Sequence, residues 1–202
     1  MSFGKVIGQE RATAMLLRAV KNDRVAHAYI FHGPEGVGKK FAAITLAMTL
    51  NCKADGERPC GDCAVCRRIT KGIHPDVMLV EPEGANIRIS QIREIERQLA
   101  MGVYEGDRRV YILDPADAMG LEASNAFLKT LEEPPADTIF VLVTDKIHSL
   151  LPTITSRCQL IPFSALGRDA VARIVSDIGG MEPEKAALAA SYVRGRLGAA
   201  LA

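Results

Sequence analysis

The glycine-rich segment GPEGVGKK constrains the fold of this 202-residue chain more than any other stretch. Its glycines, Gly33, Gly36 and Gly38, allow backbone N–H groups to close around a phosphate. The ammonium of Lys39 can then reach the phosphate oxygens. The next position normally carries a Ser or Thr hydroxyl that binds Mg²⁺, and here it is Lys40. The segment therefore predicts a phosphate loop that lacks one part of its metal site.

The flanks of this segment have the composition that a phosphate loop requires. Residues 27–31 (HAYIF) form a short apolar run that predicts a buried strand, and residues 39–50 have apolar side chains typical of a helix. Strand, glycine loop and helix is the order in which phosphate loops occur. The alternative is a glycine-rich turn that joins a strand to a helix and binds no ligand.

Further apolar segments predict an α/β fold. Expected helices span 9–23, 89–101 and 121–131, and further expected strands span 76–80, 109–114, 138–143 and 158–161. Nearly continuous apolar strands that alternate with helices indicate a parallel sheet covered on both faces. We therefore expect a five-stranded parallel sheet.

The C-terminal part of the chain has a different texture. From about residue 164 the strand signals stop, alanines become frequent, and helices are expected at 168–178 and 183–194. We expect a first domain over 1–163 and a small helical lid domain over 164–202. The sequence ends inside an alanine-rich run, so we expect that lid to be truncated.

Charge and hydropathy bear on the compartment and on the partners. The net charge is +1, so no global basic field draws the chain to nucleic acid or anionic lipid. No apolar segment approaches the ~20 residues of a membrane span, and residues 1–5 do not resemble a signal peptide. We expect a cytoplasmic protein with no membrane partner.

Four of the five cysteines form a cluster in sequence: Cys52, Cys60, Cys63 and Cys66. In a reducing compartment such a cluster more often binds a metal than forms disulfides. Four sulfurs at about 2.3 Å around a tetrahedral Zn²⁺ leave no open coordination position, so the zinc would be structural. We predict a zinc module at about residues 51–67. The alternative is a redox dithiol that uses one Cys-x-x-Cys pair.

Two further residues, Cys158 and His74, are expected to have mainly structural roles. Cys158 is far away in sequence and is expected to be a small buried apolar residue. His74 is expected to be a loop residue, with a fallback role as a zinc ligand because the cysteine cluster is near.

Six motifs follow one another in an order that resembles the clamp-loader subunits of bacterial DNA polymerase III, which belong to the AAA+ ATPase superfamily. They are VIGQE at 6–10, HAY at 27–29, the phosphate loop, the four-cysteine insertion, LKTLEEPP at 128–135 and SRC at 156–158. The resemblance covers essentially the whole chain. It implies an AAA+ P-loop domain with an inserted zinc module, followed by a helical lid and a C-terminal collar domain that is absent from this chain.

Three departures from the family pattern distinguish its delta-prime branch from its gamma/tau branch, whose members are the working ATPases. Lys40 removes the hydroxyl for Mg²⁺. Asp114 could still ligate a cation, but Pro115 stands where the resemblance places the acid that orients water, and Asp117 does not match that spacing. Gly198 stands where the resemblance places a phosphate-sensing arginine. Because hydrolysis needs a positioned cation and an oriented water, the site is predicted to be hydrolytically dead and of the delta-prime type. The loop glycines and Lys39 remain, so weak binding of ATP or ADP stays open.

Arg157 has the remaining function that the resemblance implies. In the family this arginine lies at the subunit edge and reaches into the ATP site of a neighbour, for which a planar, permanently charged guanidinium is suited. The alternative is a surface or salt-bridged arginine that precedes a strand. Lys129 and the pair Glu132 and Glu133 are expected to border the subunit interface.

The resemblance also implies a role and a set of partners. The chain would be a non-hydrolysing stator that holds the loader together during replication. Its direct partners would be gamma/tau and delta subunits, and it would act on the sliding clamp and primer–template DNA through the complex.

Two other functional classes compete with this one. A self-sufficient gamma/tau-type ATPase predicts ATP turnover by the chain alone and its loss on Lys39→Ala; Lys40 and Pro115 disfavour it. A free-standing zinc-dependent nucleic-acid-binding protein predicts tight, salt-sensitive DNA binding, which the near-neutral charge disfavours.

Overall fold

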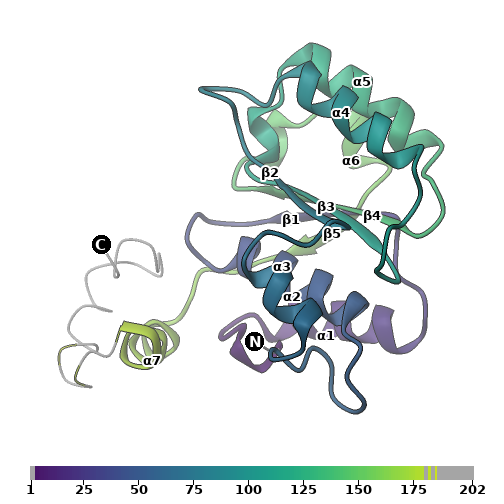
Figure 1. Cartoon of the computed structure of the whole chain (residues 1–202). Coiled ribbons are helices and arrows are strands. Elements are labelled where there is room, and N and C mark those ends of the chain that lie inside the picture. Colours follow the sequence, from purple (N-terminus) through teal and green to yellow (C-terminus); the bar gives the residue numbers. More distant parts are fainter. Residues whose placement is uncertain (1–2, 180–181, 183–184, 186–202) are drawn as a thin grey trace.

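Five parallel strands form one sheet in the order β2-β3-β4-β1-β5 (Figure 1). The structure is a computed structural model, and it describes residues 3–179, 182 and 185. The strands are β1 (Ala28–His32), β2 (Val77–Val80), β3 (Arg109–Leu113), β4 (Thr138–Thr144) and β5 (Gln159–Pro162). β1 lies between β4 and β5, with Ile30 opposite Leu142 on one side and Leu160 on the other. The predicted five-stranded parallel sheet is confirmed.

Helices cover both faces of this sheet, α1, α2 and α3 on one and α4, α5 and α6 on the other (Figure 1). They are α1 (Glu10–Lys21), α2 (Lys39–Asn51), α3 (Ala64–Thr70), α4 (Ile89–Leu99), α5 (Leu121–Glu132), α6 (Pro152–Thr155) and α7 (Arg168–Gly179), with 3-10 helices at Phe3–Lys5, Ala116–Ala118 and Ile147–Ser149. The pattern did not predict α3 or α6, because their 7 and 4 residues are too few for a periodicity to show. Within the described part of the chain, no helix has the length and apolar character that a membrane span requires.

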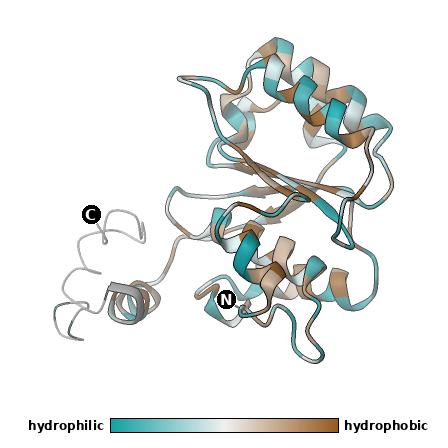
Figure 2. Ribbon diagram, in the orientation of Figure 1, coloured by the Kyte–Doolittle hydropathy of each residue, from teal (hydrophilic) through white to brown (hydrophobic). Residues whose placement is uncertain are grey.

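Alternate side chains of the central strands enter two separate apolar cores, one on each face. The ribbon of Figure 2 is coloured hydrophobic along much of the sheet. Tyr29 and Phe31 of β1 pack with α1, α2 and α3, whereas Ile30 packs with α4, α5 and α6. Successive strand residues point to opposite faces, so a strand that is buried on both faces must be apolar at every position. All seven residues of β4 are buried, which explains the continuous apolar run from Ile139 to Val143 between its two terminal threonines.

The last described helix, α7, packs against the N-terminal segment. Val171 and Val175 belong to the same core as Phe3. At Gly8, where φ is +76°, a Cβ would lie 2.7 Å from Leu166 Cδ2, so the two segments are in close contact. The expected helix 168–178 is confirmed as α7, whereas the second expected lid helix, 183–194, falls almost entirely outside the described residues.

Candidate functional site

The phosphate loop joins the end of β1 to the first turn of α2, as the sequence predicts. Gly33, Gly36 and Gly38 have φ values of +147°, +74° and +95°, which side-chain-bearing residues rarely adopt. A Cβ on Gly33 would also lie 2.1 Å from the carbonyl oxygen of Phe163. The loop conformation thus favours glycine at all three positions, and the close passage of the chain after β5 also requires it at Gly33.

Gln9 connects this loop to the segment after β5, a role that the sequence did not reveal. The side chain is 3% exposed, and its Nε2 donates to the carbonyls of Val37 (3.3 Å) and Ser164 (2.8 Å). Its Oε1 accepts a hydrogen bond from the Ser164 N–H at 3.0 Å. The VIGQE motif therefore holds the phosphate loop in place through a buried amide.

Lys39 is folded back onto the loop. Its Nζ donates to the carbonyls of Gly33 (2.7 Å) and Pro34 (2.6 Å), and the residue is 7% exposed. Burial lowers the pKa of Lys39, and the carboxylates of Asp145 and Asp114 oppose that shift. A phosphate would replace these carbonyls as the acceptor of the Lys39 hydrogen bonds.

Lys40 forms ion pairs where a metal ion would be expected. Its Nζ lies 2.6 Å from Glu81 Oε1 and 3.9 Å from Asp114 Oδ2. Asp114 follows β3 and is the carboxylate that was predicted to ligate a cation; burial raises its pKa, and Lys40 counteracts that shift. An ammonium only donates hydrogen bonds and cannot coordinate a cation. The residues present therefore do not fit Mg²⁺.

A pocket of about 320 Å³ adjoins Lys39 and Asp114. Asp117 lies in it because the 3-10 helix Ala116–Ala118 returns the chain toward β4, although its spacing did not match the family pattern. Its Oδ1 accepts a hydrogen bond from Thr144 Oγ1 at 2.6 Å, and its Oδ2 lies 3.8 Å from Lys146 Nζ. The Asp117 oxygens are thus engaged by the protein.

The four predicted cysteines come together in space. Cys52 directly follows α2, Cys63 directly precedes α3, and Cys60 and Cys66 complete a group whose sulfurs all lie within 4.8 Å of one another. Four sulfurs bound at about 2.3 Å to one tetrahedral ion would lie about 3.8 Å apart. The observed Sγ–Sγ distances of 3.6 Å for Cys52–Cys60 and 4.0 Å for Cys60–Cys66 match that geometry. The cluster can therefore hold a metal ion.

Backbone N–H groups point at three of these sulfurs. Cys60 N donates to Cys52 Sγ (3.5 Å), Cys63 N to Cys60 Sγ (3.3 Å) and Cys66 N to Cys63 Sγ (3.4 Å). Hydrogen bonds from the N–H groups of Cys63 and Asp62 lower the pKa of Cys60 to about 6, whereas burial raises the pKa of Cys66 to about 12. A metal ion must displace the proton of Cys66 when it binds.

His74 is not part of this cluster, so its fallback role as a zinc ligand is wrong. Its Nδ1 accepts a hydrogen bond from the Asp76 N–H at 3.2 Å, and its Nε2 faces Glu105 Oε1 at 3.3 Å. The buried imidazole instead supports the loop that precedes β3. Cys158, by contrast, is partly buried against the second core, and burial raises its pKa to about 12, as expected for an apolar role.

Arg157 lies on the surface, two residues after α6 and immediately before Cys158. Its Nη2 is 2.8 Å from Glu132 Oε1 at the end of α5, and its Nη1 donates to the Thr153 carbonyl at 3.0 Å. The side chain is 36% exposed. The ion pair of the alternative interpretation is therefore present, at an exposed position.

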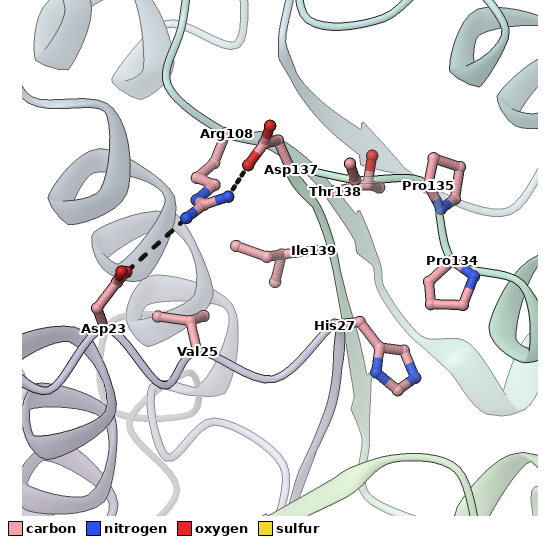
Figure 3. A pocket seen from close by; sticks show the side chains of 10 residues that line it. Asp23, Val25, His27, Arg108, Pro134, Pro135, Asp137, Thr138 and Ile139 are labelled. Atoms are coloured by element: carbon pink, nitrogen blue, oxygen red, sulfur yellow. Dashed lines mark ion pairs between the residues drawn. The ribbon is translucent and has the colours of Figure 1, made fainter.

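Two sequence motifs meet at the opposite end of the sheet (Figure 3). His27 of HAY, together with Pro134 and Pro135 of LKTLEEPP, lines a pocket of about 260 Å³ at the start of β1 and β4. Arg108 closes one side of this pocket. It forms an ion pair with Asp137 and another with Asp23, 3.8 Å away. No ligand-binding residue predicted from the sequence lines this pocket, which lies away from the phosphate loop.

Asp76 is a buried charge that the sequence did not single out. Its Oδ1 accepts from the N–H of Tyr104 (2.7 Å), its Oδ2 accepts from those of Glu105 and Gly106 (both 2.8 Å), and Arg109 Nη2 lies 3.3 Å away. Burial alone would raise the pKa of Asp76, but these donors outweigh burial and lower it. One carboxylate thus orders the loop before β3.

Replacing Asp76 by asparagine is expected to destabilise the protein by about 3 kcal/mol, because a buried arginine and backbone donors lose their anionic partner. A lowered folded-state pKa stabilises the protein above the unfolded pKa of about 4, and this contribution is lost as pH falls through the folded value. Urea unfolding at pH 7 and near pH 3 measures both effects. The difference between wild type and variant should shrink in acid, whereas exposed Asp107→Asn should cost less than about 1 kcal/mol.

The chain is similar to known proteins along most of its length. A family model described as DNA polymerase III, delta subunit, matches residues 8–167. The delta' subunit of DNA polymerase III from Bacillus subtilis is 41% identical over 81% of this chain and 50% of the relative, and that from Pseudomonas aeruginosa is 39% identical over 75% and 48%. The tau subunit from Bacillus subtilis is 38% identical over 84% of this chain and 30% of the relative. The chain spans about half the length of the delta' relatives.

Solved structures share the fold. A gamma-subunit-related protein from Thermotoga maritima is 26% identical, with a TM-score of 0.62 over 89% of this chain and 57% of the other. The RuvB branch migration motor of the same organism has a TM-score of 0.68 over 99% of this chain and 61% of the other. At 16% identity the second likeness concerns the fold alone.

Proposed function

This chain belongs to the DNA polymerase III delta-subunit family, and from that premise we propose that it is a non-hydrolysing stator of the clamp loader. It holds the loader together while the assembly places the sliding clamp on primed DNA. Its direct partners are gamma/tau and delta subunits. It reaches the clamp and primer–template DNA through the complex.

The observation that carries this proposal is the ion pairing of Lys40 with Glu81 and Asp114. These contacts hold the Lys40 ammonium beside Asp114, the carboxylate expected to bind the metal ion, and Pro115 provides no group that could orient an attacking water. Phosphoryl transfer depends on both. The chain therefore keeps the shape of an ATPase domain without its chemistry.

Arg157 is the residue that acts on the neighbouring subunit in this proposal. Its guanidinium is exposed, and one carboxylate and a nearby carbonyl hold it at the end of α5. A guanidinium can fork across two phosphate oxygens, which an ammonium cannot do. We assign it the role of an arginine finger that serves the ATP bound by an adjacent motor subunit, with Lys129 and Glu133 beside the interface.

Zn²⁺ is the metal we propose for the four cysteines. An all-sulfur set with near-tetrahedral spacing favours Zn²⁺ over harder cations, and it leaves no open position for catalysis. The ion would tie the segment between Cys52 and Cys66 to the ends of α2 and α3.

The second candidate is a gamma/tau-type ATPase, because the Bacillus subtilis tau subunit is 38% identical, close to the 41% of delta'. Purified chain with Mg²⁺ and ATP separates the two functions. We expect no turnover above that of Lys39→Ala, which lacks the phosphate-binding ammonium. Turnover that Lys39→Ala abolishes would establish the ATPase instead.

Clamp loading tests the stator role itself. The chain is combined with gamma/tau and delta subunits, clamp and primed DNA, and clamp retention on circular DNA is measured with and without it. We expect loading only when the chain is present. Equal loading in its absence would contradict the proposal.

A further inference from the structure

The position of Lys40 can be compared with the metal site of other P-loop proteins. In P-loop proteins the ion is held between the residue that follows the loop lysine and an acidic residue at the end of a neighbouring strand. Here the first of these is Lys40 itself, and its Nζ lies 3.9 Å from Asp114 Oδ2, directly after β3. The ammonium also lies 2.6 Å from Glu81 Oε1, which follows β2. The ammonium of Lys40 therefore lies beside Asp114, the carboxylate that would hold the ion.

The surrounding charges decide what this position can bind. Asp114 and Glu81 face Lys40, and Asp117 faces Thr144 and Lys146. The Lys40 ammonium, 3.9 Å from Asp114 Oδ2, would repel a divalent cation brought to that carboxylate.

An anion in the pocket beside the phosphate loop would meet both positive and negative side chains. Lys39 lines the pocket beside the backbone N–H groups of the loop, and the Lys40 ammonium lies 3.9 Å from Asp114, which also lines it. Glu35 and Asp145 also line the pocket, and in the described part of the chain neither forms an ion pair, so they repel an anion and limit the affinity.

From this arrangement we propose that Lys40 is a built-in replacement for Mg²⁺, and that the phosphate loop binds nucleoside di- or triphosphates in their metal-free form. This inference goes beyond the proposed stator function, because it names a ligand for the phosphate loop of the chain itself. The bound phosphate chain has an ammonium beside it instead of a metal that bridges its outer phosphates. The ligand is accordingly held without being hydrolysed.

Binding of fluorescent ADP in excess EDTA and in excess MgCl₂ tests the inference on the full chain. Wild type is expected to bind ADP at least as tightly in EDTA as in MgCl₂. The reason is that Mg²⁺ neutralises the phosphate charge of ADP but gains no coordinating group from the protein. Lys40→Thr restores a hydroxyl next to Asp114 and is expected to bind about 5- to 150-fold more tightly with Mg²⁺ than without it, the usual size of a coupling between two ligands. Lys53→Thr, an exposed lysine beyond the other end of α2, is the matched control and should retain the wild-type pattern.

Inorganic pyrophosphate as competitor separates recognition of the phosphate chain from recognition of the whole nucleotide. Displacement of ADP by pyrophosphate in EDTA supports the lysine-bound phosphate chain, and failure of pyrophosphate to compete would overturn it. Tighter wild-type binding with Mg²⁺, an unchanged pattern in Lys40→Thr with a native circular dichroism spectrum, or no binding in either condition would also overturn it. Any of these results leaves clamp loading by the assembly unaffected, so it is distinguishable from failure of the stator role.

Discussion

Replacing Arg157 by alanine is expected to lower ATP turnover at the neighbouring motor site by about 10³-fold or more, with the assembly preserved. A guanidinium that forks across the outer phosphate oxygens stabilises the charge of the transition state more than that of bound ATP. A 10³-fold effect corresponds to about 4 kcal/mol. The exposed ion pair of Arg157 with Glu132 contributes about 1 kcal/mol or less, so exchanging Glu132 for a phosphate is favourable.

Two variants separate this role from a structural one. Arg157→Lys keeps the charge but loses the fork, so turnover should remain well below wild type. Glu132→Gln frees Arg157 from its ion pair and should leave turnover at or above the wild-type level. Phosphate release by the reconstituted loader gives the rates, and size-exclusion chromatography shows whether it is assembled. Wild-type turnover with Arg157→Ala in an intact complex would remove the finger.

Replacing Cys66 by serine is expected to abolish stoichiometric zinc binding and to destabilise the domain by about 3 kcal/mol or more. Structural zinc sites contribute about 10–16 kcal/mol in isolated zinc-finger peptides, and loss of one buried thiolate removes much of that. Cys52 and Cys66 are both fully buried against the core of α1, α2 and α3, so an empty site would leave unpaired sulfurs inside the protein. The loss is therefore expected to reach α2, the helix that begins at the phosphate loop.

Elemental analysis and urea unfolding measure these effects. Cys158→Ser alters a cysteine in the other core and should retain zinc. Because burial raises the pKa of Cys66 to about 12, metal binding releases its proton, and zinc affinity should fall as pH is lowered. Wild type that holds well under one zinc per chain after gentle purification would contradict the four-thiolate site.

Much of the fold could be predicted from the sequence because its signals are local. Apolar runs buried on both faces, such as β4, identify themselves by composition, and α4 and α5 by the 3.6-residue period. The cysteine site could also be predicted from the sequence, because two Cys-x-x-Cys steps place three of the cysteines close together in the chain. The phosphate loop followed from glycines at positions where φ is positive.

The sequence by itself determined the sheet, the loop, the cysteine cluster and the loss of the metal-binding hydroxyl at Lys40. Only the tertiary structure decided the partners of the charged groups: Glu81 for Lys40, 41 residues away, Glu132 for Arg157, 25 residues away, and the loop donors for Asp76. Periodicity and short spacings are fixed by the geometry of one helix, strand or turn. Which carboxylate meets which cation depends on how distant segments pack and on the register of the strands between them, and no local pattern encodes that.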